Sequence, residues 1–233
     1  MALNKIYKTK FRIDPVFFEK KISGSQQPEK IDGLILPLKL DNRQKISPID
    51  DQGNSSACVC YSVCSIAEAY FWRRNGFPAN FDAMELYKHC KKVDGNPKAD
   101  GTYPEVGFKC AVEDGLFGNI EEPQVIRIDN RKNSAYIDQL KFAIFKYDFV
   151  VGGFKITSGL YKLVDGNYIY ERTNKIEGGH AMVICGYNKT GFIIANSWGK
   201  EFGQKGFAIY PYDEFNKDFI YGAYLKNTLN DLD

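Results

Sequence analysis

The sequence predicts an α+β protein whose helices lie in the first half and whose strands lie in the second. Up to about residue 146, segments with helical spacing of apolar side chains follow residues that cap helices. Beyond that point, short runs rich in aromatic and β-branched residues alternate with turn residues. Helices followed by strands are typical of α+β folds. We expect a functional site in a cleft between the two halves.

The composition excludes several functions. The 233 residues are enough for a substantial core, and 44% hydrophobic with 26% charged residues is typical of a soluble globular protein. A formal net charge of +2 gives no reason to expect a nucleic-acid or membrane partner. No apolar run approaches the roughly 20 residues that span a bilayer. We therefore expect a monomer with no nucleic-acid and no membrane partner.

Residues 1–35 form a basic N-terminal arm. The first 30 residues hold seven Lys or Arg but only three Asp or Glu, and residues 23–28 have the composition of a linker. Two interpretations stay open. The arm is either a solvated tail or strand packed elsewhere, or a short propeptide that crosses the lobe interface and partly covers the active site.

The central stretch of the chain is a loop that leads into a buried helix at Cys58. Residues 54–56 are Asn, Ser and Ser, all favoured at a helix N-cap, and Gly76 is a suitable stop. A thiol on the first turn of a helix lies at the positive end of the helix dipole, which favours its thiolate form. Cys58 is therefore our candidate nucleophile.

The other elements follow from capping patterns and periodicity. Residues 36–49 should be extended, because prolines oppose a helix there. Further helices are predicted over 81–92, opened by an Asp82 and Glu85 capping box, over 103–115, opened by Tyr103-Pro104 and closed by Gly115, and over 134–146, with Ile137, Leu140, Ile144 and Phe145 on one side. Strands are predicted over 149–156, 180–187, 191–198, 206–210 and 219–225, with a hairpin turn at 188–191.

The six cysteines lack the dense spacing of a disulfide scaffold. We expect free thiols in a reducing compartment and, since no export signal is present, a cytoplasmic protein, although signal-independent export stays open. Cys60 and Cys64 lie one helical turn apart and suggest a metal site with His89 or Cys90. We favour ordinary buried thiols, because ligands inside a packed helix rarely assemble a tetrahedral site. No metal or cofactor is expected.

The sequence offers two histidines that could activate a cysteine. His89 lies in a charged helix, whereas His180 opens a strand after two glycines that allow close approach of a substrate. Asn196 lies on the hairpin partner of that strand and can reach the imidazole. A cysteine, an imidazole and a group that orients the imidazole form the pattern of thiol acyl transfer, so Cys58, His180 and Asn196 are the candidate catalytic set.

Several motifs in the same order resemble those of papain-like cysteine peptidases. They cover roughly residues 36–210, and four of them together are far more specific than any one alone. The motifs are Gln52-Gly53 before Cys58, Gly101 with Tyr103-Pro104, His180-Ala181, and Asn196-Ser197-Trp198-Gly199, preceded by a domain start at Leu36-Pro37, Leu40-Asp41 and Arg43-Gln44-Lys45.

The resemblance implies a role for each matching position. Cys58 would attack an amide carbonyl, His180 would act as acid and base, and Asn196 would orient His180. Gln52 and the backbone N–H of Cys58 would bind the oxyanion. The substrate-binding set implied in this way is Gly101 and Thr102 for the peptide backbone, Pro104 and Ala181 for the second side chain before the scissile bond, and Trp198 as a shield over the Asn–His hydrogen bond.

The resemblance also implies a two-lobed papain-like domain over residues 36–233, with a helical lobe at about 50–120 and a β lobe at about 121–233. Val59, Ser55 and Ala99 depart from the family pattern, the last two because they replace a cystine pair. These departures suggest a bacterial-type branch without the usual disulfides. The expected function is a thiol peptidase acting on a peptide or protein substrate. A deamidase, an isopeptidase and a catalytically silent peptide-binding protein remain alternatives.

Overall fold

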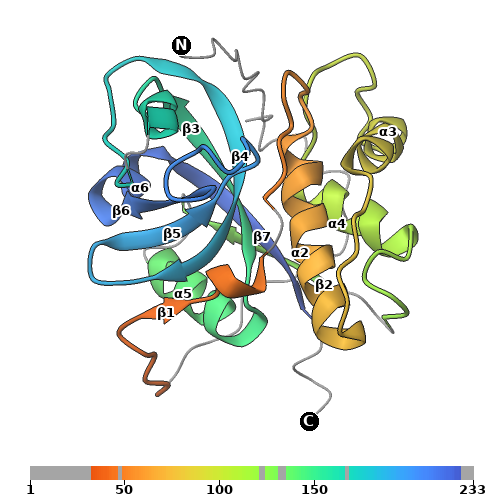
Figure 1. Cartoon of the computed structure of the whole chain (residues 1–233), viewed down its shortest axis with the longest axis horizontal. Coiled ribbons are helices and arrows are strands. Elements are labelled where there is room, and N and C mark those ends of the chain that lie inside the picture. Colours follow the sequence, from red (N-terminus) through yellow and green to blue (C-terminus); the bar gives the residue numbers. More distant parts are fainter. Residues whose placement is uncertain (1–32, 47–48, 121–123, 131–134, 166–167, 227–233) are drawn as a thin grey trace.

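The computed structural model describes residues 33–46, 49–120, 124–130, 135–165 and 168–226. The predicted arm and linker therefore lie outside the described residues, apart from residues 33–35. In Figure 1 the helices α2, α3 and α4 stand side by side on the right, and the sheet with α5 and α6 lies on the left. The predicted α+β class and the two-lobed arrangement are both present.

Helix α2 (Cys58–Asn75) runs through the middle of the molecule and contacts both lobes (Figure 1). Most of its residues are buried, which explains why its sequence is apolar on nearly every side. Gly76 ends the helix as predicted, with φ of 77° and its N–H donated to the carbonyl of Trp72. The predicted N-cap is wrong: Ala57 occupies that position, and no side chain caps the helix.

Helices α3 (Ala83–Val93) and α4 (Pro104–Glu113) pack beside α2. Asp82 caps α3, because its carboxylate accepts the backbone N–H groups of Met84 and Glu85. Pro104 is the first residue of α4, where its missing N–H costs nothing. The two predicted helix starts are confirmed to within two residues.

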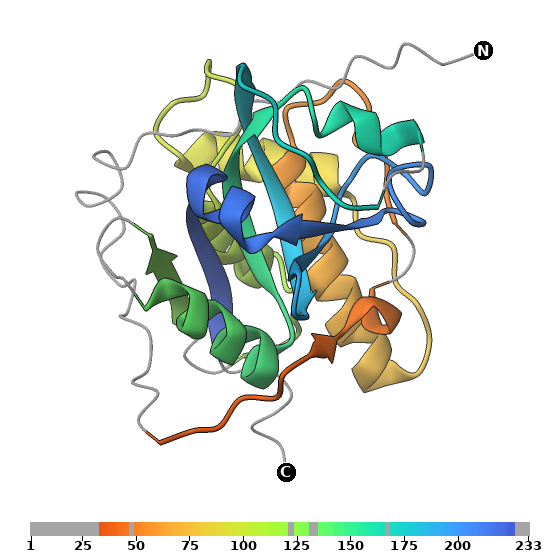
Figure 2. The ribbon, with the colours of Figure 1, turned by 90° about the vertical axis from the view of Figure 1, so that its left-hand side faces the viewer.

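The described strands form one antiparallel sheet in the order β2-β7-β3-β4-β5-β6, with β1 paired to β4. Figure 2 shows this sheet from the side that α5 covers. The hairpin turn is confirmed. The backbone N–H of Asn188 donates to the carbonyl of Gly191, and the side-chain oxygen of Asn188 accepts the backbone N–H groups of Thr190 and Gly191. The strands are β1 (Leu40–Asp41), β2 (Gln124–Asp129), β3 (Val150–Thr157), β4 (Ile176–Tyr187), β5 (Gly191–Ala195), β6 (Phe207–Pro211) and β7 (Phe219–Lys226).

The two faces of the sheet carry separate cores. On β4, Ala181, Val183 and Cys185 belong to the core shared with α2, α3 and α4. Met182 and Ile184 alternate with them and belong to the core shared with α5 and α6. The strict period of two places His180 and its neighbours on opposite faces. The face of β4 that carries Ala181 therefore packs against the start of α2.

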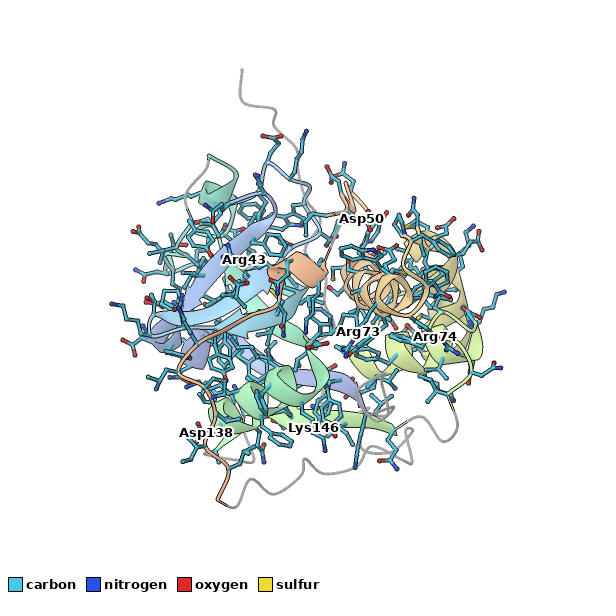
Figure 3. All side chains as sticks on the ribbon, turned by 60° about the horizontal axis from the view of Figure 1, so that its bottom comes forward. Arg43, Asp50, Arg73, Arg74, Asp138 and Lys146 are labelled. Atoms are coloured by element: carbon cyan, nitrogen blue, oxygen red, sulfur yellow. The ribbon has the colours of Figure 1, made fainter. Side chains whose placement is uncertain are left out.

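Asp148 fastens the lobes at the end of α5 (Tyr136–Tyr147). Its carboxylate lies 2.5 Å from Lys45 of the 3-10 turn η1 (Arg43–Lys45) and 3.4 Å from Arg73 of α2. Its carbonyl accepts the side chain of Asn42, and its φ is 65°. Figure 3 shows Arg73 on the side of α2 that faces α5. One buried carboxylate therefore joins three segments.

Two elements are absent from the sequence-based prediction. Strand β2 pairs with β7 at the edge of the sheet, and helix α6 (Tyr212–Asp218) is a short connection between β6 and β7. Phe145 was predicted on the same side of its helix as Leu140 and Ile144, but it is 44% exposed. Leu140 and Ile144 are four residues apart and share the buried face, whereas Phe145 directly follows Ile144 and points in another direction. Among the described residues, no helix combines the length and apolar character needed to cross a membrane.

Candidate active site

Cys58 is the first residue of α2 and is fully buried against β4. The backbone N–H of Ala181 hydrogen-bonds its sulfur, and one turn further along α2 the hydroxyl of Ser62 lies 3.5 Å from the Ala181 carbonyl. The start of α2 therefore rests on β4 beside His180. The predicted nucleophile therefore contacts the residue that directly follows the predicted base, although Cys58 and His180 are 122 residues apart in sequence.

His180 is held by Asn196. Its Nε2 lies 2.7 Å from the side-chain oxygen of Asn196, which also accepts the backbone N–H of Ser197. Because an amide oxygen can only accept hydrogen bonds, the Nε2 of His180 is the donor in this bond. Within the described residues, the buried Nδ1 has no hydrogen-bond partner. It is therefore the nitrogen left for chemistry.

Trp198 is a buried aromatic residue that packs against His180. Its ring centroid lies 5.0 Å from that of His180, and Tyr161 stacks on its other side at 5.3 Å. Phe202 meets its edge at 5.7 Å. All of Trp198 but 1% is buried. The position agrees with the predicted shielding of the His180–Asn196 bond, and the aromatic contacts of Tyr161 add a layer that the sequence did not indicate.

Gln52 is placed by the loop before α2. Its backbone N–H donates to the carbonyl of Ser197 at 2.8 Å, and Asp51 bridges to Trp198, so this loop runs antiparallel to the segment after β5. The Ser197 hydroxyl donates to the side-chain oxygen of Gln52 at 2.6 Å, while Gln52 Nε2 donates to the Ser55 carbonyl at 2.9 Å. Ser197 thus fixes the amide of Gln52. One local signal for this role is that Ser197 directly follows Asn196 in the chain.

Two of the predicted substrate-binding residues, Gly101 and Thr102, lie in the bend before α4 and differ in their hydrogen bonding. Gly101 has φ of 76°, which favours glycine. Its N–H donates to the hydroxyl of Tyr87 and its carbonyl accepts from Lys91, so both backbone groups are engaged within the helical lobe. Thr102 is buried, and its hydroxyl has no hydrogen-bond partner within the described residues.

Two further predicted residues are buried, and one of them, Ala181, contacts the nucleophile. Pro104 is buried at the start of α4, and Ala181 is fully buried beside the Cys58 sulfur. Cys58, Tyr103 and Ala181 belong to the same apolar cluster. A side chain that reaches this region therefore meets apolar surface.

Burial dominates the electrostatics of the site. It raises the pKa of the Cys58 thiol to about 11, against the lowering effect of the backbone N–H groups of Ala181 and Val59. Burial also lowers the pKa of His180 to about 4, while the bond to Asn196 raises it. The start of the helix alone therefore does not bring the pKa of this buried thiol below its ordinary value. A thiolate requires the imidazolium beside it, so that the pair carries no net charge.

All six cysteines are buried and unbridged. The Sγ atoms of Cys60 and Cys90 lie 3.8 Å apart. The metal cluster considered from the sequence, which joined Cys60 and Cys64 to His89 or Cys90, does not form. The group that does assemble among the described residues is His89, Cys110 and Glu113. It lies on α3 and α4 and is separate from Cys58.

Comparisons with known proteins agree with this arrangement. At the sequence level, oryzain gamma chain from Oryza sativa is 24% identical over 202 residues, covering 76% of this chain and 55% of the relative. Human cathepsin L2 is 21% identical over 211 residues, covering 78% of this chain and 63% of the relative. The chain therefore spans less than two thirds of the length of these curated relatives.

Solved structures share the fold. Xylellain, a cysteine protease from Xylella fastidiosa, superposes with a TM-score of 0.72 at 19% identity and covers 98% of this chain and 100% of its own. Digestive procathepsin L 3 of Tenebrio molitor gives a TM-score of 0.66 at 17% identity over 87% of this chain and 74% of its own. The profile described as papain family cysteine protease matches residues 36–218. On this match, which includes every residue placed around Cys58, the chain belongs to the papain family of cysteine proteases.

Proposed function

We propose that the chain is a thiol peptidase that hydrolyses peptide bonds through an acyl-enzyme on Cys58. The observation that carries the proposal is the 2.7 Å bond between His180 and Asn196, buried beside a cysteine at the start of α2 in a chain of this family. The bond fixes the imidazole while leaving its Nδ1 available, as acid–base catalysis at a thiol requires.

In the proposed first step, the Cys58 thiol gives its proton to His180 Nδ1, and the thiolate forms a bond to the scissile carbonyl carbon. The carbonyl oxygen becomes an oxyanion, which the backbone N–H of Cys58 and the amide of Gln52 stabilise. His180 then protonates the leaving nitrogen, the C–N bond breaks and a thioester remains. A water attacks the thioester, gives its proton to His180 and releases the acid, and the proton returns to Cys58.

For the substrate, we propose a peptide or protein chain that lies along the bend before α4. The unpartnered hydroxyl of Thr102 supports a role there, and Gly101 would shape the bend, since its backbone groups are already engaged. Pro104 and Ala181, both apolar and buried, would lie at the base of the pocket for the side chain two residues before the scissile bond and would favour an apolar side chain there.

The test is cleavage of a random peptide library by the purified chain, together with a Cys58→Ala variant. We expect cleavage that stops when Cys58 is replaced or alkylated. Release of ammonia from side-chain amides, or cleavage confined to isopeptide bonds, would replace the peptidase by another thiol acyl transfer. Rapid alkylation of Cys58 without turnover of any of these substrates would leave only peptide binding.

A further inference from the structure

We propose that α3 and α4 carry a binding site for a thiophilic divalent cation with the preferences of zinc, formed by His89, Cys110 and Glu113. One ring nitrogen of His89, the Sγ of Cys110 and a carboxylate oxygen of Glu113 all lie within 4.8 Å of one another. Imidazole nitrogen, thiolate sulfur and carboxylate oxygen are the three ligand types that zinc takes from proteins. This site is separate from the proposed peptidase chemistry at Cys58.

The scaffold places these atoms on rigid elements. Cys110 and Glu113 are three residues apart in the last turn of α4, so they lie on the same side of the helix, and His89 faces them from α3. Zinc bonds of about 2.0–2.3 Å put tetrahedral ligand atoms about 3.3–3.8 Å apart. Cys110 is fully buried, whereas the side chains of His89 and Glu113 are 28% and 46% exposed and can rotate by the small amount required.

A second observation concerns the other nitrogen of His89. Its Nδ1 lies 2.9 Å from a carboxylate oxygen of Asp114, which fixes Nδ1 as the donor. Histidines that bind metals in proteins usually donate their remaining N–H to a carboxylate in this way. The other ring nitrogen, Nε2, faces Glu113, whose nearer oxygen is 3.5 Å away. A divalent cation placed between Nε2 and this oxygen would be coordinated by both residues.

Two neighbouring groups also contact the proposed ligands. Lys109 lies 3.8 Å from the other oxygen of Glu113 and therefore approaches it from a different side. The thiol of Cys110 hydrogen-bonds Cys90, and this contact together with burial raises its pKa. A divalent cation would replace the thiol proton, so that a metal–sulfur bond forms and one proton is released to solvent. The fourth position would be filled by water.

The experiment uses the full chain with Cys58→Ala, which removes the thiol at the active site as a competing ligand. Titration with Co²⁺ should give one equivalent of a thiolate-to-cobalt charge-transfer band, and Zn²⁺ should displace it. His89→Ala and Glu113→Gln, both partly exposed positions, should weaken cobalt binding at least tenfold. Lys88→Ala, an exposed neighbour on α3, serves as the matched control and should bind as tightly as the parent.

Thermal unfolding supplies a second readout. Zn²⁺ should raise the Tm of the Cys58→Ala chain and leave that of the additional His89→Ala variant unchanged, because only ligands that bind the folded state stabilise it. Absence of the cobalt band in the parent, or a band of unchanged affinity in the His89→Ala variant, overturns the proposal. The latter result would assign the band to Cys60 and Cys90 or another thiol, and the former would leave His89 only as a hydrogen-bond partner of the two carboxylates.

Discussion

His180 Nε2 and the side-chain oxygen of Asn196 lie 2.7 Å apart, and the bond joins β4 to the residue that follows β5. The same oxygen also accepts the N–H of Ser197, so its lone pairs are both used. The imidazole is thus held by a group that is itself held by the backbone. Orientation of this kind is set before a substrate arrives.

Removing the orienting oxygen should impair turnover. We expect Asn196→Ala to lower kcat/KM by about 10²-fold, because His180 is then free to rotate away from the reacting atoms. The effect should fall mainly on kcat, which steady-state hydrolysis of a small peptide substrate will measure. A loss confined to KM, or a variant with unchanged kcat, would contradict the orienting role.

Gln52 and Ser197 should act on the oxyanion and not on the nucleophile. Gln52→Ala is expected to lower kcat by about 10²- to 10³-fold, since the amide stabilises charge that develops only in the transition state. Ser197→Ala should cost less, about tenfold, because it only releases the amide to rotate. Alkylation of Cys58 by iodoacetamide should proceed at nearly the parental rate in both variants. If alkylation and turnover fall equally, Gln52 supports the Cys58 nucleophile before the reaction and does not act specifically on the oxyanion.

The reactivity of Cys58 should depend on His180. Burial raises the pKa of Cys58 to about 11 and lowers that of His180 to about 4, so a lone charge at either position is disfavoured. In the parental chain, we expect iodoacetamide at mildly acidic pH to label Cys58 far faster than the other five cysteines, which are also buried, because the proposed role of His180 is to accept the Cys58 proton.

The matched variant is His180→Ala. Its labelling at about pH 6 should be slower by 10²-fold or more, on the order expected when a thiolate loses its counter-ion, and should rise steadily as the pH increases. Peptide mass spectrometry over a pH series will measure both rates. Superimposable pH profiles for the parent and the variant would show that His180 does not hold the thiolate.

Glu68 should make stability depend on pH. It is buried on α2, where its carboxylate accepts the N–H of Phe81, and burial raises its pKa from 4.5 to about 7. The folded state therefore binds the proton more tightly than the unfolded chain. This stabilisation is complete below about pH 4.5 and is lost as the pH rises through about 7.

We expect the free energy of unfolding to decrease between about pH 5 and pH 8 more steeply in the parent than in Glu68→Gln, which cannot titrate. Urea unfolding at several pH values will measure both curves, and their difference separates Glu68 from the other carboxylates. Parallel curves would show that Glu68 titrates alike in the folded and unfolded states.

Asp148 should contribute to the contact between the lobes. Asp148→Asn keeps the size of the side chain and tolerates the φ of 65°, but it removes the charge that faces Lys45 and Arg73. We expect a loss of about 1–2 kcal/mol in the free energy of unfolding, larger at low salt than at high salt. Asp41→Asn, an exposed partner of Arg43, is the control and should cost less. Equal losses in the free energy of unfolding would show that Asp148 contributes no more than an exposed ion pair.

Much of the fold could be predicted because its signals are local. The stop of α2 at Gly76, the cap of α3 at Asp82, the proline start of α4 and the hairpin at Asn188 all depend on residues within a few positions of one another. Strand β2 and helix α6 were missed, since the first is defined by its pairing with β7 and the second is too short to show a period. Phe145 was misplaced because apolar character alone does not fix its direction.

The candidate catalytic residues can be identified without coordinates, because each has a local signal: a cysteine at a helix start, a histidine after two glycines, and an asparagine on the neighbouring strand. The contacts that hold these residues depend on the tertiary structure. The bond from Ser197 to Gln52 joins residues 145 positions apart, and the triple contact of Asp148 and the grouping of His89 with Cys110 likewise depend on packing between elements. The pKa of Cys58 follows the same rule. The helix start favours a thiolate locally, but the cost of burying a charge is set by everything packed around the sulfur, and that cost is the larger effect.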